Sequence, residues 1–259
     1  MKTLSVLTLT LTLFTACQSE PNPINMSSIE VPQANILQLR NPNISLPSDS
    51  YQLMVVTTDN WNSKTGTLQR YAKNPNISTA AWIKVGKPVE IILGRNGLGW
   101  GKGLHSTPKN AKYIKKEGDG RAPAGLFTLG HGFGYQNLNI DFPYATYKRT
   151  DHCVDDSSSK WYNKIIDSTK VEKDYRSFEH MKLNNHLYKY GITVNHNPEQ
   201  IKDAGSCIFM HIRSGNGKGT AGCTAMSEDK IMTILKWLKE EDKPLLLQLP
   251  KEEILNINI

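Results

Sequence analysis

Short apolar runs rich in β-branched residues follow one another along most of the chain, separated by Gly, Asn and Lys. Runs of this length with such boundaries predict strands. The clearest are residues 52–57, 67–71, 88–93, 191–197, 207–213 and 245–249. They predict a mainly β domain of the α+β class, built as a sheet or a β-sandwich.

One segment near the C-terminus repeats with a helical period instead. Residues 227–242 place four apolar side chains on one stripe, those of Ile231, Ile234, Leu235 and Leu238. Ser227 is suited to cap the start of this helix, and Pro244 ends the pattern. The sequence therefore predicts one C-terminal helix.

The two ends of the chain differ in composition. In residues 1–16 one positive charge precedes an apolar run, which is typical of a bacterial export signal and is shorter than the roughly 20 residues of a membrane-spanning helix. Residues 17–50 are rich in Pro, Asn and Ser without an apolar period, which predicts a tether. We expect a folded domain over residues 51–259, with a large irregular insertion over residues 131–190.

The segment Phe14-Thr-Ala-Cys17 resembles the lipobox of bacterial lipoproteins. The resemblance implies cleavage before Cys17 and lipidation of its thiol; an ordinary signal peptide with an incidental cysteine is the alternative. Gln18 resembles the residue that follows the cysteine in outer-membrane lipoproteins. We therefore expect a periplasmic protein that is held at the outer membrane by a lipid anchor.

The formal net charge is +7, and it stays positive when the signal is removed with Lys2. A basic surface suits an anionic partner such as a cell wall or membrane headgroups. Export and the scattered placement of the lysines argue against nucleic acid. A merely solvated basic surface is the alternative.

The expected mature domain has three cysteines, Cys153, Cys207 and Cys223. The periplasm oxidises thiols, and an odd number leaves one thiol unpaired. A disulfide between Cys153 and Cys207 would leave Cys223 free and reactive. A disulfide between Cys207 and Cys223 is the alternative, and it would quench the thiol.

Cys223 ends a glycine-rich loop that follows a strand carrying His211. Alternation along residues 207–213 places His211 on the face opposite the apolar core face. A histidine that takes the thiol proton makes cysteine a nucleophile. Gly222 lets a substrate carbonyl approach backbone N–H groups that stabilise an oxyanion. These residues predict an acyl-transfer enzyme.

Metal-ligand residue types also occur at His152, Cys153, Asp155 and Asp156. No second cluster at a zinc-like spacing accompanies them, and the two aspartates are better explained as turn or cap residues. We expect neither a metal nor another cofactor.

Two short motifs resemble the L,D-transpeptidase catalytic domain of bacterial cell-wall enzymes, the YkuD-like family. They are Pro-Ala-Gly-Leu-Phe at residues 123–127 and, after the histidine strand, Thr-Ala-Gly-Cys at residues 220–223. The resemblance covers residues 51–249 and implies the family's sheet-rich fold. The family commonly has His before the Gly-Cys pair and Arg two places after the Cys, where this chain has Ala221 and Ala225.

The resemblance implies that Cys223 is the acyl-accepting nucleophile, His211 its base and Gly222 part of the oxyanion region. Four further residues are candidates for substrate contacts. They are Thr220, which would also help to hold the loop, Arg213 or Arg121, which would replace the missing positive charge, and His196. For His196, a structural role is the alternative.

The implied substrate is the stem tetrapeptide of peptidoglycan, which would form a thioester with Cys223. Transfer to an amine would make the protein an L,D-transpeptidase, and transfer to water would make it an L,D-carboxypeptidase. A non-catalytic wall-binding lipoprotein is the alternative that Ala221 and Ala225 motivate. A thiol–disulfide protein is disfavoured because the chain has no Cys-x-x-Cys.

Overall fold

The computed structural model describes residues 37–77, 81–215 and 217–257, and most of their regular structure is β-strand. Its helices are α1 (Glu228–Trp237) and the short 3-10 helix η2 (Lys251–Glu253). The strands are β1 (Leu37–Leu39), β2 (Gln52–Thr58), β3 (Thr65–Ala72), β4 (Ile83–Ile92), β5 (Leu98–Trp100), β6 (Ala122–Gly134), β7 (Tyr144–Thr146), β8 (Asp151–Val154), β9 (Ile165–Asp167), β10 (Phe178–His180), β11 (Tyr190–Val194), β12 (Phe209–Ile212), β13 (Thr224–Met226), β14 (Leu245–Pro250) and β15 (Ile254–Ile257).

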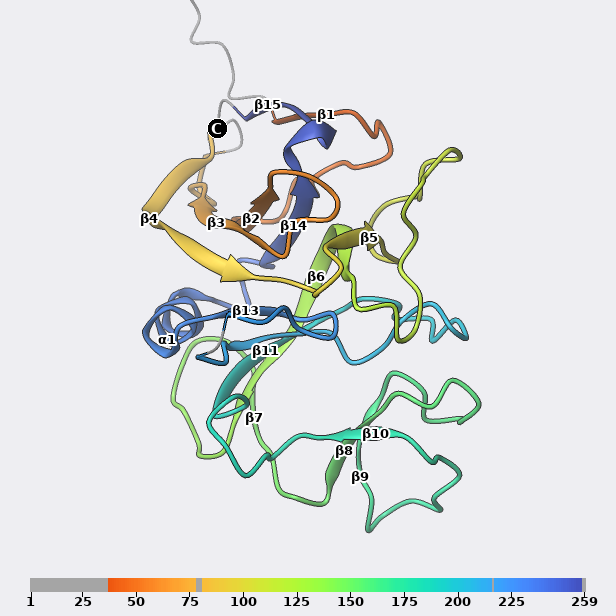
Figure 1. Cartoon of the computed structure of the whole chain (residues 1–259). Coiled ribbons are helices and arrows are strands. Elements are labelled where there is room, and N and C mark those ends of the chain that lie inside the picture. The colour runs from red at the N-terminus through yellow and green to blue at the C-terminus, as the bar shows by residue number, and fades with distance from the viewer. Residues whose placement is uncertain (1–36, 78–80, 216, 258–259) are drawn as a thin grey trace, which may run out of the picture. The chain divides into compact units, whose positions relative to one another are not determined.

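The main sheet has ten strands and closes on itself (Figure 1). Its order is β11-β12-β13-β4-β3-β2-β14-β6-β5, with β7 also on β6, and β11 pairs with β6 as well as with β12. Closure pairs the strands that would otherwise be sheet edges. The prediction of a mainly β domain is thus confirmed. The strands form one closed sheet and not two facing sheets.

The strands predicted from the apolar runs form the walls of this sheet. β2 and β14 pair in parallel and are buried along nearly their whole length. Their aliphatic side chains join the hydrophobic core together with apolar side chains of β6, such as those of Leu126 and Phe127. Burial of this kind stabilises the fold by about 25 cal/mol per Å² of apolar surface.

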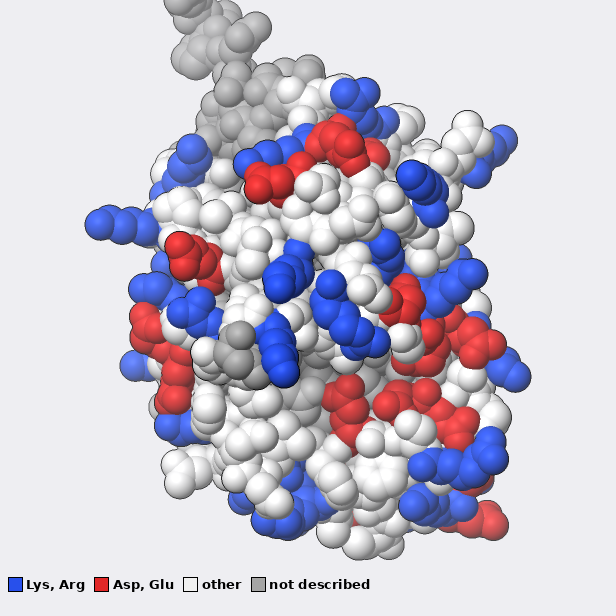
Figure 2. Space-filling model, in the orientation of Figure 1, with Lys and Arg blue, Asp and Glu red and all other residues white. Residues whose placement is uncertain are grey.

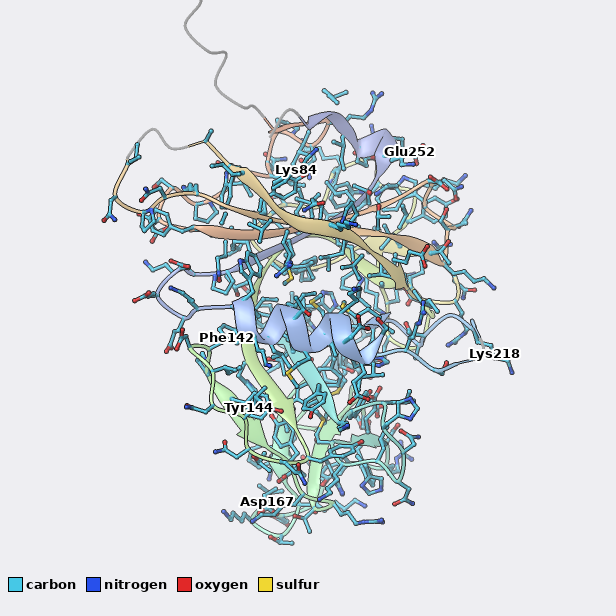
Figure 3. All side chains as sticks on the ribbon, turned by 90° about the vertical axis from the view of Figure 1, so that its left-hand side faces the viewer. Lys84, Phe142, Tyr144, Asp167, Lys218 and Glu252 are labelled. Atoms are coloured by element: carbon cyan, nitrogen blue, oxygen red, sulfur yellow. A yellow bond between two sulfur atoms is a disulfide. The ribbon has the colours of Figure 1, made fainter. Side chains whose placement is uncertain are left out.

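The predicted helix is present but ends earlier than expected. Ile231, Ile234, Leu235 and Leu238 are all buried, and α1 packs on β11 and β12 (Figure 3). Leu238 already has extended backbone angles, so the helix ends at Trp237 and not at residue 242. Ser227 occupies the N-cap position, but its hydroxyl bonds to the Asp229 carboxylate and does not cap a helix N–H.

The insertion that we expected to be irregular contains regular secondary structure of its own. Residues 135–189, which we call the cap, contain β7 and a separate three-stranded sheet in the order β10-β8-β9. A disulfide joins Cys153 on β8 to Cys207, just before β12. It is the pairing that the sequence favoured, and it links the cap to the strand of His211.

Residues 37–50 were assigned to the tether, and the structure corrects this boundary. β1 pairs with β15, and Asn41 and Ser50 are buried. The Asn41 amide donates to the Ser106 carbonyl at 2.9 Å, and the Ser50 hydroxyl donates to the Lys243 carbonyl at 2.7 Å. Polar side chains with hydrogen-bond partners let this segment pack without an apolar period. The signal, Cys17 and the rest of the tether lie outside the described residues.

Candidate active site

Cys223 lies one residue before β13, and among the described residues it is the free cysteine. Only 5% of its surface is exposed. Its Sγ accepts a hydrogen bond from the Phe209 N–H at 3.4 Å and donates one to the Cys207 carbonyl at 3.6 Å. The thiol is therefore held against the start of β12.

His211 faces the same side of the sheet as Cys223. β12 and β13 run in parallel with His211 opposite Ala225, two residues after Cys223. Since side chains alternate along a strand, the side chains of these three residues share a face. The Nδ1–H of His211 donates to the Ile212 carbonyl at 2.8 Å, so Nε2 is the nitrogen that can accept a proton.

The histidine is neutral in its resting state. Burial lowers the pKa of His211, although its hydrogen bond to Ile212 opposes the change. A neutral imidazole with a basic Nε2 is the form that general-base catalysis requires.

A pocket of about 210 Å³ contains both side chains. Its lining comes from the end of β4, the cap, β12 and the glycine-rich loop: Ile92, Glu179, Leu183, Leu187, Tyr188, His211, Arg213, Ser214, Lys218, Gly219, Thr220, Ala221, Cys223 and Ala225. This volume is below the roughly 300–1,000 Å³ of sites for drug-sized ligands. The pocket therefore has room for only part of a larger ligand.

The two departures from the family motif both line this pocket. Ala221 and Ala225 present small apolar groups where His and Arg are common in the family. Arg213 and Lys218 line the pocket as well and bring positive charge to it. Lys218 lies on the loop that projects beyond α1 (Figure 3).

Cys223 is a neutral thiol at rest. Burial raises the pKa of the Cys223 thiol well above its ordinary value, and the nearby charge of Glu179 adds to the rise. The Phe209 N–H and Lys115 act in the opposite direction and do not offset it. The site therefore has no preformed thiolate, and a base must remove the proton as the sulfur attacks.

Thr220 holds the turn that presents the cysteine. Its hydroxyl donates to the Cys223 carbonyl at 2.6 Å and accepts a hydrogen bond from the Gly222 N–H at 3.2 Å. Its backbone bonds to Leu93 and Arg95 at 2.8 and 2.9 Å. Thr220 thus has the loop-holding contacts expected from the sequence, and the Gly222 N–H is directed at Thr220 instead of at an oxyanion.

Residue 222 is glycine because its neighbours are close. A Cβ there would lie 3.1 Å from the Arg121 carbonyl oxygen and 3.2 Å from Cδ1 of Ile208. The φ angle of Gly222 is not in the left-handed region. Close packing beside Cys223, and not an unusual turn, therefore favours glycine at this position.

Arg121 is not in the pocket. Its guanidinium donates to the carbonyls of Trp61 and Leu98 at 3.1 and 2.8 Å and lies 4.4 Å over the Tyr113 ring. These contacts join the segment before β6 to the loop around residue 61. Of the two arginines considered for the missing positive charge, the structure places Arg213 at the site and Arg121 elsewhere.

His196 has the contacts of a structural histidine. It is 2% exposed, its Nδ1 accepts from the Lys102 N–H at 3.2 Å and its Nε2 donates to the Ala204 carbonyl at 3.0 Å. Burial lowers the pKa of His196 to about 3. It lines a different pocket of about 340 Å³, next to the disulfide. The structural alternative for His196 therefore describes it better than substrate binding.

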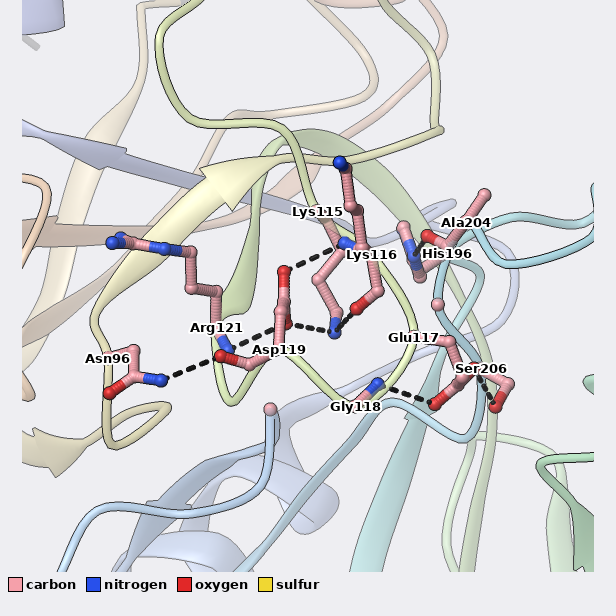
Figure 4. A network of polar contacts seen from close by, with 12 residues as sticks. Asn96, Lys115, Lys116, Glu117, Gly118, Asp119, Arg121, His196, Ala204 and Ser206 are labelled. Atoms are coloured by element: carbon pink, nitrogen blue, oxygen red, sulfur yellow. Dashed lines mark hydrogen bonds and ion pairs between the residues drawn. The ribbon is translucent and has the colours of Figure 1, made fainter.

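A polar network that the sequence did not indicate supports the site (Figure 4). The Asp119 carboxylate accepts hydrogen bonds from Lys115 Nζ at 2.7 Å, the Lys116 N–H at 2.7 Å and the Arg121 N–H at 2.9 Å. A Cβ at Gly222 would lie 3.8 Å from Cε of Lys115. The network therefore holds a buried ammonium group beside the turn of the nucleophile.

Sequence reasoning also missed Glu179 and Tyr188, which the cap brings to the pocket. Nothing in the sequence distinguishes them from the many other polar residues of the insertion. Lys115 carried no signal either, because Lys, Glu, Gly and Asp around it are typical of an exposed turn.

The residues considered as possible metal ligands make other contacts. His152 stacks on Phe178 with ring centroids 3.8 Å apart, its Nδ1 is 3.0 Å from the Tyr175 hydroxyl, and Cys153 is in the disulfide. Within the described ranges, no group of three or more His, Cys, Asp and Glu residues is arranged to hold a metal ion.

The surface has no single basic patch on the face seen in Figure 2. Lys and Arg side chains are spread over this face with Asp and Glu among them. In the part of the chain that the structure describes, no helix is long and apolar enough to cross a membrane.

Comparison with known proteins agrees with this geometry. The family model of the L,D-transpeptidase catalytic domain (YkuD) matches residues 61–245, well over half of the chain. No curated protein and no solved structure matches. The matched range includes the pocket, the cap and both motifs. The chain therefore belongs to the YkuD family of L,D-transpeptidase catalytic domains.

Proposed function

We propose that this protein is a peptidoglycan L,D-transpeptidase. Cys223 forms a thioester with a stem tetrapeptide and passes the acyl group to an amine. The observation that carries the proposal is that Cys223 and His211 line one pocket, with the histidine oriented so that Nε2 is its basic nitrogen.

Acylation begins from the neutral thiol. As Cys223 Sγ attacks the carbonyl carbon before the terminal D-Ala, His211 Nε2 takes the thiol proton. The C–N bond of the tetrahedral intermediate then breaks, and the imidazolium gives its proton to the departing D-Ala amine. The products of this half-reaction are a thioester on Cys223 and free D-Ala.

Deacylation reverses these roles. The acceptor amine attacks the thioester carbon and gives a proton to His211, and the C–S bond breaks. The proton returns to the departing sulfur, which restores the neutral thiol. If water takes the place of the amine, the product is a tripeptide and the activity is that of an L,D-carboxypeptidase.

The test is an incubation of the protein with disaccharide tetrapeptide, followed by mass spectrometry. We expect a thioester on Cys223 and a cross-linked dimer. Tripeptide without dimer would identify a carboxypeptidase. Neither adduct nor product, with the Cys223 thiol titrating as free, would favour the non-catalytic wall-binding lipoprotein that Ala221 and Ala225 suggest.

Two matched variants make the test specific. Cys223→Ser removes the nucleophile and should abolish the adduct. His211→Gln removes the base with little change in size, and should lower the acylation rate by about 100-fold or more, the usual contribution of a general base.

We also propose that the protein is exported and anchored at the outer membrane through lipid on Cys17. The apolar leader and the lipobox-like segment before Cys17 support this. A catalytic domain on such an anchor would meet peptidoglycan in the periplasm, where the disulfide between Cys153 and Cys207 is stable.

A further inference from the structure

A second cavity, of about 340 Å³, lies between the cap and the main sheet. Its lining includes Asp151 on β8 and Asp167 on β9 from the cap, and Val194 on β11 from the sheet. Its volume is within the roughly 300–1,000 Å³ of sites for small ligands, whereas the catalytic pocket is smaller. Cys223 and His211 do not line it, so it is separate from the catalytic pocket.

The lining of this cavity presents hydrogen-bond acceptors that have no donor. Asp151 accepts the Lys148 N–H through Oδ2 at 2.6 Å, but its Oδ1 accepts no hydrogen bond within the described part of the chain. The same is true of Oδ1 of Asn195, whose amide nitrogen donates to the Thr128 hydroxyl at 2.9 Å. Neither of these two oxygens is fully buried, so both can accept a hydrogen bond from a ligand.

The donors of the lining, in contrast, already have acceptors in the protein. The Asn163 amide donates to the carbonyls of His196 and Asn197, each at 2.8 Å. The Thr193 hydroxyl donates to the His131 carbonyl at 3.2 Å, and His196 uses both ring nitrogens in hydrogen bonds within the protein. A ligand of this cavity must therefore supply the donors, as hydroxyl and ammonium groups do.

The charges around the cavity favour a neutral ligand. Among the described residues no Lys or Arg lines it, whereas Asp151 and Asp167 do, which disfavours an anion. The protein itself stabilises these carboxylates. Asp167 accepts the N–H and the hydroxyl of Thr169 at 3.1 and 2.7 Å, and Lys170 Nζ lies 3.9 Å from its Oδ2. Since their charge does not require a cation from a ligand, hydroxyl groups are the donors that fit best.

Apolar side chains line the cavity on both sides. Ile165 belongs to the cap, and Val194 and Ile208 come from the sheet side. The Tyr147 ring lies there as well, with its hydroxyl 2.5 Å from His131 Nε2. Apolar walls with a few polar groups fix the orientation of a ligand that is itself amphipathic. A sugar ring is such a ligand, because it has C–H groups on its faces and hydroxyl groups around its edge.

We infer that this cavity binds a neutral saccharide, whose hydroxyl groups donate to Asp151 and Asn195. The cavity adjoins the segment that holds the thiol, because Cys207 and Phe209 line it and both bond through their backbones to Cys223 Sγ. Within the proposed function the saccharide is part of the glycan strand that carries the stem peptide. This link to peptidoglycan rests on the proposed function, and the binding of sugar does not.

Calorimetry of the whole chain with N,N′-diacetylchitobiose, a neutral disaccharide without peptide, tests the inference. We expect saturable binding with a Kd on the order of 1 mM, as a few neutral hydrogen bonds produce. The hyaluronan disaccharide, in which one sugar is an anionic uronic acid, should bind at least about tenfold more weakly. No saturation with the neutral disaccharide would overturn the inference. Tighter binding of 1,5-diaminopentane would overturn it as well, because it would show a site for cations.

Asp151→Asn tests where the saccharide binds. The variant keeps an oxygen that can accept the Lys148 N–H but loses the charge that strengthens a hydrogen bond, and we expect about tenfold weaker binding. Asp156→Asn is the matched control. Asp156 lies on the same cap and accepts the Ser158 N–H at 3.0 Å, but it does not line the cavity. An unchanged Kd in Asp151→Asn, or an equal loss in both variants, would overturn the inference.

A tetrapeptide without sugar distinguishes this cavity from the catalytic pocket. An excess of the peptide should leave the Kd of the disaccharide unchanged, whereas competition would place the sugar in the catalytic pocket and overturn the inference. The two proposals also fail separately. Saccharide binding without a thioester on Cys223 would support the cavity and overturn the transpeptidase, and a thioester without saccharide binding would do the reverse.

Discussion

Cys223, the proposed nucleophile, is a neutral thiol, and its surroundings explain why. Cys223 is buried, accepts one backbone N–H and has Glu179 nearby. Burial and a negative charge both disfavour a thiolate. Such a thiol resists oxidation and alkylation, and in the proposed mechanism it reacts when His211 takes its proton.

Alkylation of Cys223 by iodoacetamide tests this state. Because the pKa of Cys223 is raised, the thiolate fraction near pH 8 is small, and we expect slower alkylation than for an ordinary cysteine, with a steady increase above pH 9. Glu179→Gln removes one cause of the raised pKa. It should accelerate alkylation at pH 8 by up to about tenfold, which corresponds to one pKa unit.

Mass spectrometry of intact protein gives both rates. Glu117→Gln serves as the control, since Glu117 is not among the groups that shift the pKa of Cys223. Rapid alkylation of the unsubstituted protein at pH 7 would contradict the neutral-thiol state.

At the scale of elements, the segment before β6 supports the catalytic turn through one buried ion pair. Lys115 Nζ and Asp119 Oδ1 are 2.7 Å apart, with 3% and 19% of their side chains exposed. The Arg121 carbonyl and the Lys115 stem lie against Gly222. A change in this segment is therefore transmitted to the nucleophile by direct packing.

We predict that Lys115→Met lowers the free energy of unfolding by about 3 kcal/mol, because it leaves the Asp119 carboxylate with two backbone N–H donors but without its cationic partner. Urea unfolding followed by tryptophan fluorescence measures the change. Lys116→Met is the matched control: the Lys116 side chain is exposed, and its loss should change stability by less than about 0.5 kcal/mol. Equal effects of the two variants would refute the role of the buried pair.

The disulfide is the second feature that supports the site at the scale of elements. Cys153 and Cys207 are 54 residues apart in the chain, and their bond attaches the cap to the region from which the Cys207 carbonyl contacts Cys223. The cap also contributes Glu179 and Tyr188 to the lining of the pocket. The position of the pocket wall therefore depends on a covalent link.

Replacing both cysteines by serine should lower the free energy of unfolding by about 4 kcal/mol, the loop-closure entropy for a loop of this length. It should also accelerate alkylation of Cys223, since the cap would shield the thiol less. Cys223→Ser, which keeps the disulfide, is the control for stability. Unchanged alkylation of Cys223 in the double variant would mean that the cap holds its place without the bond.

At the scale of the whole molecule, the proposed catalytic residues come from neighbouring strands of the main sheet. β12 and β13 join β11 on one side and β4 on the other, and β11 returns to β6. The cap leaves the sheet after β6 and rejoins it at β11. The cap residues before β11 therefore lie beside the strands of His211 and Ala225, because β11 pairs with β12 and β12 pairs with β13.

The proposed anchor gives a prediction for the complete chain. Expressed with its leader in a bacterium that lipidates proteins, the protein should partition into the detergent phase of Triton X-114, and Cys17→Ala should move it to the aqueous phase. Immunoblotting of both phases measures the change. Aqueous partitioning of the unsubstituted protein would favour plain secretion.

The sequence alone determined the local features. Apolar periods located β2, β12, β14 and α1, and the order of two short motifs identified the family, because such features depend on neighbouring residues. The odd cysteine count and the glycine-rich loop predicted Cys223 and His211 as the reactive pair, because thiol chemistry requires a base within reach.

Only the tertiary structure decided which polar residues accompany that pair. Arg121, the alternative to Arg213, and His196, for which a structural role was the alternative, make structural contacts elsewhere, whereas Glu179 and Lys115 are brought to the site. Their positions follow from pairing between residues far apart in the chain, which no local pattern encodes. The charge around the nucleophile is therefore a property of the closed sheet and its cap.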